Sequence, residues 1–259
     1  MWSVVGTLHL VRGLQDRVAR AHPAEHTEDD RGWRLRLAPG CAWWVATVQP
    51  HHDAGRREVL QRVLEAERFY ARHRTPARFQ VSPPACPEAL DTVLASRGYD
   101  RRSPMSLQAA STAAVRRRDL VPASRSLEIR LDHGLTPSWF DVWHGLHGEG
   151  ADPAAERQML GRVAQPTAYA AALMGGDVVG IGRVVADTGW AGVFGMATVP
   201  RARGRGVARA VLAALAGWAA RCGTERMYLQ VERDNGTGLR LYGESGFREL
   251  SRYHYRSLD

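Results

Sequence analysis

Lysine is absent from this chain. All 35 basic residues are arginines, and with 27 acidic residues they give a formal net charge of +8. A basic chain can indicate a nucleic-acid partner. Here the absence of Lys beside abundant Ala, Gly and Arg is typical of a GC-rich coding bias. The arginines are also scattered, the longest run being 116–118. We therefore expect no nucleic-acid partner; the alternative is a nucleic-acid face with salt-dependent affinity.

Cysteines are few and long apolar runs are missing. Cys41, Cys86 and Cys222 are odd in number and far apart, which favours buried or incidental thiols over disulfides, and we expect no metal site. The longest apolar run, 211–220, is too short to cross a bilayer. The first residues show neither the basic region nor the cleavage site of a signal peptide. We therefore expect a cytoplasmic protein with no membrane partner.

The composition is that of a globular protein, with 259 residues of which 44% are hydrophobic and 24% charged. This length suits one large domain or two of ordinary size. The stretch 108–126 is rich in small, polar and charged residues, contains Pro122 and lacks sustained apolar periodicity, so it is predicted to be a linker. It divides the chain into a first half, 1–107, and a second half, 127–259.

The second half alternates between strand-like and helix-like patterns, which predicts an α/β fold. Helical spacing of apolar residues and capping residues indicates helices, and short apolar runs bounded by Gly or Pro indicate strands. The predicted strands cover 127–131, 190–200, 226–232 and 247–258, with a hairpin over 168–187. The predicted helices cover 137–148, 152–164, 206–223 and 235–246.

The first half repeats the later part of this pattern. The letters WWVATVQP at 43–50 resemble FGMATVP at 194–200, and a long helix, a strand and a shorter helix follow in both places. Gly98 and Gly246 lie 148 positions apart, and Pro50 and Pro200 lie 150 apart. Repetition on this scale predicts two copies of one α/β fold.

The stretch VPRARGRGVARAVL, 199–212, places glycines and arginines between a predicted strand and a predicted helix. A helix N-terminus has unpaired N–H donors and the positive end of the helix dipole, and glycines let an anion approach them. Gly204 and Gly206, with Arg203, Arg205 and Arg209, therefore predict a phosphate-binding loop. An arginine-coated turn in water is the alternative. The loop is not a Walker loop, since no Lys-Ser/Thr follows, and Arg209 replaces the third glycine of the dinucleotide fingerprint.

The loop from Arg203 to Ala208 resembles the R/Q-x-x-G-x-G/A loop of the GCN5-related N-acetyltransferases. MATVP precedes it, YLQVERDN follows the helix, and Asn235 is followed by Tyr242 and a Gly-Phe pair, so the resemblance covers 127–256. It implies the acyl-CoA N-acyltransferase fold, which is a mixed, mostly antiparallel sheet flanked by helices. The whole chain resembles a tandem member with a degenerate first copy. A frame beginning at Arg201 also fits, but the frame from Arg203 places residues 206–208 at the helix start.

The resemblance implies acetyl-CoA as the acetyl donor. Backbone groups of 196–199 would pair with the pantetheine arm, the loop would hold the pyrophosphate, and Tyr242 would protonate the leaving thiolate. Asn235 would contact the arm and also suits a helix N-cap, and Tyr242 could instead be a packed aromatic. The implied cofactor-binding residues are Met196, Ala197, Thr198, Val199, Arg203, Gly204, Arg205, Gly206, Val207, Ala208, Asn235 and Tyr242.

The first half has lost the corresponding residues. At an offset of 148, Asn235 falls on Pro87 and Tyr242 on Leu94, and HHDAGR at 51–56 replaces the loop. Proline has no N–H and leucine has no proton to give. We therefore expect the first copy to be unable to bind CoA, and to be structural or to help wall the acceptor site.

The general base is open. Many relatives carry a glutamate on the strand before the loop, but 190–200 has no carboxylate. The candidates are Glu232, Glu149, Asp152 and His147, and proton loss through water without a dedicated base is equally open. A set of aromatic residues could line an acceptor pocket or simply belong to the core: Trp139, Trp143, Trp190, Tyr253 and Tyr255.

These patterns favour an acetyl-CoA-dependent N-acetyltransferase. The expected acceptor is the primary amine of a small molecule, either a metabolite or an antibiotic-like compound, which attacks the thioester directly. The alternatives are acetylation of protein lysines or N-termini, and a CoA-binding module without turnover. We expect a monomer or a homodimer.

Overall fold

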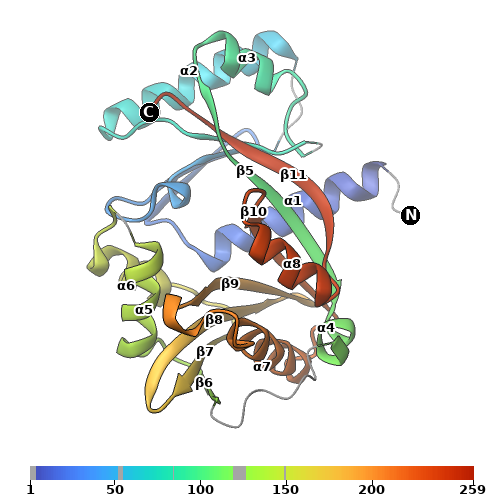
Figure 1. The fold of residues 1–259 in the computed structure, drawn as a ribbon. Helices are drawn as coiled ribbons and strands as arrows, with labels where there is room; N and C mark the ends of the chain where they lie inside the picture. The colour runs from blue at the N-terminus through green and yellow to red at the C-terminus, as the bar shows by residue number, and fades with distance from the viewer. Residues whose placement is uncertain (1–3, 52–54, 84, 119–126, 149) are drawn as a thin grey trace.

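The computed structural model of the chain describes residues 4–51, 55–83, 85–118, 127–148 and 150–259. Figure 1 shows the helices over 56–72 and 90–96 at one end of the molecule and most second-half elements at the other. The strands are β1 His26–Asp30, β2 Trp33–Leu37, β3 Val48–Pro50, β4 Phe79–Val81, β5 Asp100–Ser111, β6 Glu128–Asp132, β7 Thr167–Met174, β8 Asp177–Asp187, β9 Trp190–Thr198, β10 Arg226–Glu232 and β11 Arg248–Ser257. The helices are α1 Val4–Ala21, α2 Arg56–Arg72, α3 Leu90–Ser96, α4 Thr112–Arg118, α5 Pro137–His147, α6 Pro153–Gly161, α7 Val207–Arg221 and α8 Gly236–Glu244.

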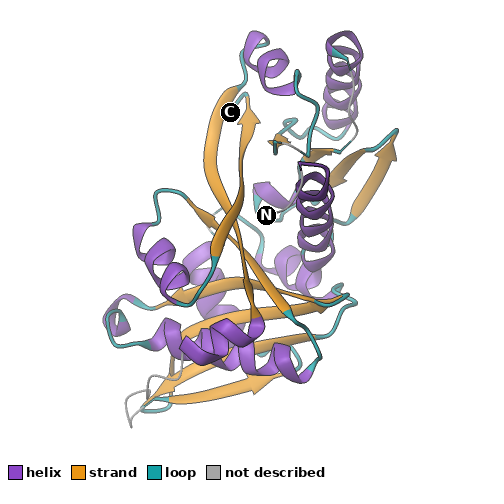
Figure 2. Cartoon of the chain, turned by 90° about the vertical axis from the view of Figure 1, so that its right-hand side faces the viewer, coloured by secondary structure: helices purple, strands orange, loops and turns teal. Residues whose placement is uncertain are grey.

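All these strands join one sheet in the order β1-β2-β3-β4-β11-β5-β10-β9-β8-β7-β6. The pairs β3·β4 and β9·β10 are parallel, and the other neighbours are antiparallel. The two long central strands, β5 and β11, come from different halves and lie side by side across the middle of Figures 1 and 2. First-half β5 lies between β10 and β11, and second-half β11 lies between β4 and β5. Each half therefore contributes a strand that the other half encloses.

The order of elements confirms the predicted fold class and the tandem copies. In the first half α2 joins the parallel pair β3 and β4, and α3 then leads to β5. In the second half α7 joins the parallel pair β9 and β10, and α8 then leads to β11. The hairpin of β7 and β8, the long helix α7 and the strand β10 also form where the sequence predicted them.

The predicted linker at 108–126 is wrong over its first part. Strand β5 continues to Ser111, and Thr112–Arg118 forms helix α4; residues 119–126 lie outside the described residues. Gln108 is paired with Leu229 on one side and Glu249 on the other. Pairing on both edges holds this stretch in the sheet although its own apolar pattern is weak. The division into domains at this point remains a proposal.

The stretch 43–50, whose sequence resembles the strand-forming 194–200, forms a strand only over its last residues. Trp43–Val45 form a turn of 3₁₀ helix, in which the Val45 N–H donates to Ala42 O at 3.0 Å and the Ala46 N–H to Trp43 O at 3.1 Å. Only Val48–Pro50 form a strand. The turn moves the two adjacent tryptophans out of the sheet, which matters for the cavity described below.

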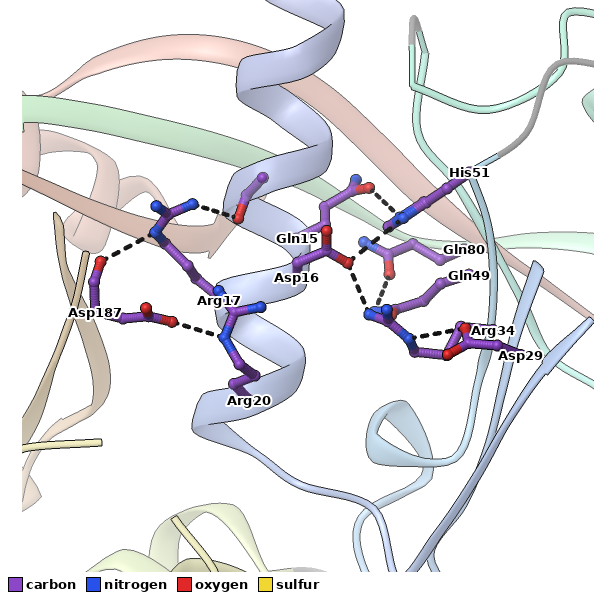
Figure 3. A network of polar contacts seen from close by, with 11 residues as sticks. Gln15, Asp16, Arg17, Arg20, Asp29, Arg34, Gln49, His51, Gln80 and Asp187 are labelled. Atoms are coloured by element: carbon purple, nitrogen blue, oxygen red, sulfur yellow. Dashed lines mark hydrogen bonds and ion pairs between the residues drawn. The ribbon is translucent and has the colours of Figure 1, made fainter. Parts of the chain in front are cut away.

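Helix α1, for which the sequence predicted no element, connects the two halves (Figure 3). On one side Arg17 Nε donates to Asp187 O at 3.1 Å, and Arg20 pairs with the Asp187 carboxylate at 2.8 Å, at the end of β8. On the other side Asp16 pairs with Arg34 of β2 at 2.7 Å. The helix is therefore held by polar contacts to both copies. In the part of the chain that the structure describes, no helix has the length and apolar character needed to cross a bilayer.

Candidate active site

Strands β9 and β10 separate partway along their length. Their parallel pairing runs from Trp190 and Arg226 to Val193 and Leu229 and then stops. Just beyond, β9 bulges, because two residues, Gly195 and Met196, lie opposite one residue of β8. Gly195 has φ of 59°, a left-handed conformation that glycine adopts without strain. The end of β9 therefore leaves the edge of β10 and opens a gap in the sheet.

Two cavities meet at this gap. The first, of about 780 Å³, extends over the ends of β9, α7 and α8, and we call it the loop groove. The second, of about 340 Å³, extends toward the first half, and we call it the aromatic cavity. Both are lined by His147, Met196, Asn235 and Tyr242. A molecule in the groove can therefore present its end to a second molecule in the cavity.

The loop groove ends on the N-terminus of α7. Gly206 caps this helix with φ of 77°, and Gly204 has φ of 73°. The Ala210 N–H donates to Gly206 O at 3.0 Å, as the first full helical turn requires. The N–H groups before it face the open end of the helix, where an anion is stabilised by the dipole. Residues 206–208 and the Arg203 side chain line the groove there, so it is suited to a phosphate group.

The structure brings most of the predicted cofactor-binding residues to this groove. Those lining it are Met196, Ala197, Thr198, Arg203, Gly204, Gly206, Val207, Ala208, Asn235 and Tyr242. Arg205 lies outside the lining, with its guanidinium 3.6 Å from Met174 Sδ on β7. The Val199 N–H donates to Val179 O at 3.0 Å. Arg201 forms an exposed ion pair with Asp177 and does not line the groove. The loop residues that do line it fit the motif frame that begins at Arg203.

Helix α8 positions two of the shared residues. Asn235 caps the helix, with Oδ1 accepting from the Gly238 N–H at 2.8 Å, as its predicted N-cap role requires. Tyr242 lies two turns further along, 8% exposed, with its ring edge-on to Phe247. Burial raises the pKa of Tyr242 to about 12, because the phenolate would lose its hydration. The hydroxyl therefore stays protonated at neutral pH at the junction of the two cavities.

The four base candidates lie in different places. His147, at the end of α5, lines both cavities, and Glu232, at the end of β10, lines the aromatic cavity. Desolvation lowers the pKa of His147, partly offset by a hydrogen bond to the Met196 backbone. Asp152 is occupied as the N-cap of α6, accepting from the Ala154 N–H at 2.8 Å. Glu149 lies outside the described residues.

Both halves form the walls of the aromatic cavity. Of the predicted aromatic set, Trp143, Tyr253 and Tyr255 line it. Trp139 belongs to the core instead, since its Nε1 donates to Ala170 O and Gly182 O, and Trp190 packs edge-on against Tyr228. The first half adds residues that the sequence did not single out: His22, Ala42, Trp43, Trp44, Ser103 and Met105. The Trp-Trp pair was the one local signal that could have found them.

The first-half counterparts of the site residues are buried. Leu94 is fully buried in the core beneath α2 and α3, and Pro87 is buried just before α3. Every residue that lines the loop groove belongs to the second half, whereas the aromatic cavity takes residues from both. Within the described ranges, no group of three or more His, Cys, Asp or Glu side chains could hold a metal ion.

Comparison with known proteins agrees with this geometry. Residues 133–247 match the model of the Acetyltransferase (GNAT) family. The chain is 25% identical over 254 residues to the uncharacterised N-acetyltransferase YobR of Bacillus subtilis, covering 95% of this chain and 98% of that one. The second half of the chain thus carries the sequence pattern of the GNAT acetyltransferase family, and the chain as a whole is similar to an N-acetyltransferase.

Solved structures show the same fold over the whole length. A GCN5-related N-acetyltransferase from Kribbella flavida superposes with a TM-score of 0.73 at 16% identity, over 97% of this chain and 95% of that one. A tandem GNAT protein from the clavulanic acid biosynthesis pathway superposes with a TM-score of 0.66 at 17% identity, over 87% of this chain and 77% of that one. The tandem arrangement is therefore found in other proteins of this fold.

Proposed function

We propose that this protein transfers an acetyl group from acetyl-CoA to the primary amine of a small molecule, a metabolite or an antibiotic-like compound. The observation that carries the proposal is the meeting of the loop groove and the aromatic cavity at Tyr242. A cavity of about 340 Å³ falls in the range of small-molecule sites. Its walls come from both copies, which favours a small acceptor over a protein chain, the alternative acceptor.

In this proposal the loop groove holds the donor. Arg203 and the N–H groups of Gly204 to Ala208 bind the pyrophosphate, and the edge of β9 at Met196 to Thr198, beyond its last pair with β10, pairs with the pantetheine arm. The gap between β9 and β10 supports this, because an arm can lie there as a further strand would. Val199 and Arg205, which the sequence also suggested, take part only if their present contacts change.

The chemistry follows from what meets at the junction. The amine nitrogen bonds to the acetyl carbon, the carbon–sulfur bond breaks, and the sulfur leaves as a thiolate. The Tyr242 hydroxyl donates a hydrogen bond to the sulfur as its charge develops. An alkyl thiol such as cysteine has a pKa of about 8.5. A phenol with a pKa of about 12 is a weaker acid than this thiol, so Tyr242 stabilises the thiolate as a hydrogen-bond donor and keeps its own proton. The proton that the amine loses passes to the base, and CoA leaves as the thiolate or takes a proton from water.

For the proton of the attacking amine, His147 is the base best placed, and Glu232 is the alternative. His147 lines both cavities, so its ring can reach the junction where the new bond forms, whereas Glu232 lines the aromatic cavity alone. The lowered pKa of His147 keeps the ring neutral, and able to accept a proton, at neutral pH.

A pH profile tests this assignment. A base with a lowered pKa stays active below its ordinary value of about 6.5 and is lost only as the pH falls through the lowered pKa. We expect His147→Gln to lower kcat/KM by about 10²-fold and to remove that acidic limb. Glu232→Gln is the matched comparison, expected to keep the limb. If only Glu232→Gln lost activity and the acidic limb of the profile, the general base would be Glu232 and not His147.

The proposed function itself is tested by CoA release. The full-length protein with acetyl-CoA is screened against small primary amines and against peptides, with the product confirmed by its mass. We expect turnover with small amines. Turnover with peptides alone would favour the protein-acetylating alternative. Thermal stabilisation by acetyl-CoA without turnover of any amine would favour a CoA-binding module.

A further inference from the structure

Two buried arginines, one from each half, converge behind the wall of the aromatic cavity. Arg183 of β8 is 1% exposed and Arg36 of β2 is 3% exposed. Arg183 Nη2 donates to Ala21 O at 2.9 Å and lies 2.7 Å from His22 Nε2. Arg36 Nη2 donates to the carbonyl oxygen of the same histidine. The two guanidinium groups thus contact a single residue whose ring lines the cavity.

Neither cation has a carboxylate partner among the described residues. The ionisable groups acting most strongly on Arg183 are the phenols of Tyr169 and Tyr228, and on Arg36 they are the phenols of Tyr255 and Tyr70. Burial lowers the pKa of both, that of Arg36 to about 10. A guanidinium keeps its charge in proteins at neutral pH, so we treat both as cations. Buried charges are normally paired, because an isolated ion is costly to remove from water.

Arg183 also has an unused donor. Its Nη1 atom is buried and has no hydrogen-bond partner in the described part of the chain. Most buried polar atoms do have partners, so this donor adds to the uncompensated charge of the cation. The existing contacts of Arg183, which are a carbonyl, a neutral imidazole and the Tyr169 hydroxyl, carry no negative charge that would balance it.

The guanidinium of Arg183 lies directly behind two rings of the cavity wall. Arg183 is paired with Phe194 of β9, so both side chains lie on one face of the sheet, and its Cζ is 5.2 Å from the Phe194 ring centroid. The His22 ring lies edge-on to Phe194 at 4.7 Å, and both rings line the cavity. Only the Phe194 ring therefore separates the guanidinium charge from the cavity, so its electrostatic field acts on a molecule bound there.

The histidine itself does not carry this charge. Its Nδ1 lies 3.2 Å from Val18 O and its Nε2 faces Arg183, so both ring nitrogens are occupied. Burial, together with Arg183 and Arg36, lowers the pKa of His22 well below its usual value, so the ring is neutral. Glu232 is the acid that lines this cavity, and it acts on the phenols of Tyr253 and Tyr255. One acid at the cavity thus faces two buried cations.

We propose that the amine accepted by this enzyme also carries a compact anionic group, a carboxylate or a phosphate. The anion lies against the wall formed by Phe194 and His22, over Arg183 and Arg36, and the amine lies toward Tyr242. The inference rests on the proposed acetyl transfer and narrows its acceptor to amino-acid-like or aminoalkyl-phosphate compounds. Two cations held without counter-ions are explained if the substrate brings the counter-ion.

The test uses matched pairs of amines with the full-length protein and acetyl-CoA. One pair is an amino acid and its amide, and the other is an aminoalkyl phosphate and its alcohol, with rates compared per free amine. We expect the anionic member of at least one pair to have a kcat/KM roughly 10-fold higher or more, as attraction between opposite charges separated by one ring supplies at a low effective dielectric constant. The pair that shows the preference distinguishes carboxylate from phosphate. Turnover with no preference in either pair would overturn this inference alone. No turnover with any amine would overturn the proposed function as well.

Substitutions of the arginines test whether the buried charge causes the preference for anionic amines. Arg183→Met, which replaces the guanidinium with a shorter, uncharged and unbranched side chain, should bring the preference close to one. Arg183→Lys should keep most of the preference, and Arg130→Met, an exposed arginine of β6, should keep all of it. If Arg183→Met does not fold, Arg36→Met gives the same readout. Unchanged preference in the folded Met variant would contradict the role of the buried charge.

Discussion

Tyr242→Phe is expected to lower kcat by about 10²- to 10³-fold, the range for losing one hydrogen-bond donor to a developing negative charge. The ring keeps its packing against Phe247, so the affinity for acetyl-CoA and the melting temperature should stay close to those of the unchanged protein. The hydroxyl alone is lost, and with it the hydrogen bond to the leaving sulfur. Steady-state CoA release, acetyl-CoA titration and a thermal melt measure the three quantities.

Tyr228→Phe is the matched control for this experiment. Tyr228 is as deeply buried as Tyr242, but it lies on β10 outside the lining of both cavities. We expect this variant to keep its kcat within a few-fold. If Tyr242→Phe also kept its rate, the hydroxyl would have no part in thiolate release, and the role of Tyr242 would be the packing role that its sequence position equally allows.

Separating the two halves should abolish folding of each. Fragments 1–118 and 127–259, expressed alone, are expected to be unfolded or aggregated, and to recover acetyl-CoA binding when expressed together. The reason is the strand exchange, since β5 pairs with β10 and β11 of the other half, and β11 pairs with β4 as well as β5. An isolated half would have unpaired strand edges in the middle of its sheet.

Circular dichroism and size-exclusion chromatography of the two fragments, separate and mixed, measure this outcome. The uncut chain is the control for the spectrum and the elution volume. A stable, monomeric 127–259 fragment that binds acetyl-CoA would contradict the prediction. It would also restore the independent domain boundary that the sequence suggested.

Much of the second half could be predicted from its sequence because its signals are local. Helix α7 has apolar residues at helical spacing, and α8 begins at an asparagine cap. The loop between β9 and α7 combines glycine and arginine where a helix N-terminus needs them. Such features depend on neighbours within a few positions, so the chain itself carries them.

The features that could not be predicted depend on distant parts of the chain. In WRLRL, the alternation of Arg and Leu predicts that Arg36 faces water. Its side chain is buried instead, with the guanidinium against His22 just after α1 and near the phenols of Tyr255 and Tyr70. Arg183 lies in a strand that is buried on both faces, so periodicity does not assign it to either one. The exchange of β5 and β11 has no local signature at all, because pairing partners more than a hundred residues apart are not encoded in a short window.

The unequal lining of the two cavities has a consequence for how this enzyme can change. The loop groove, where we propose that the donor binds, is lined by the second copy alone, whereas His22, Trp43, Trp44 and Met105 of the first copy line the aromatic cavity proposed for the acceptor. If these assignments hold, substitutions in the first copy can alter which amine is accepted without touching the acetyl-CoA contacts. The exchanged strands would meanwhile hold the two copies together while each varies.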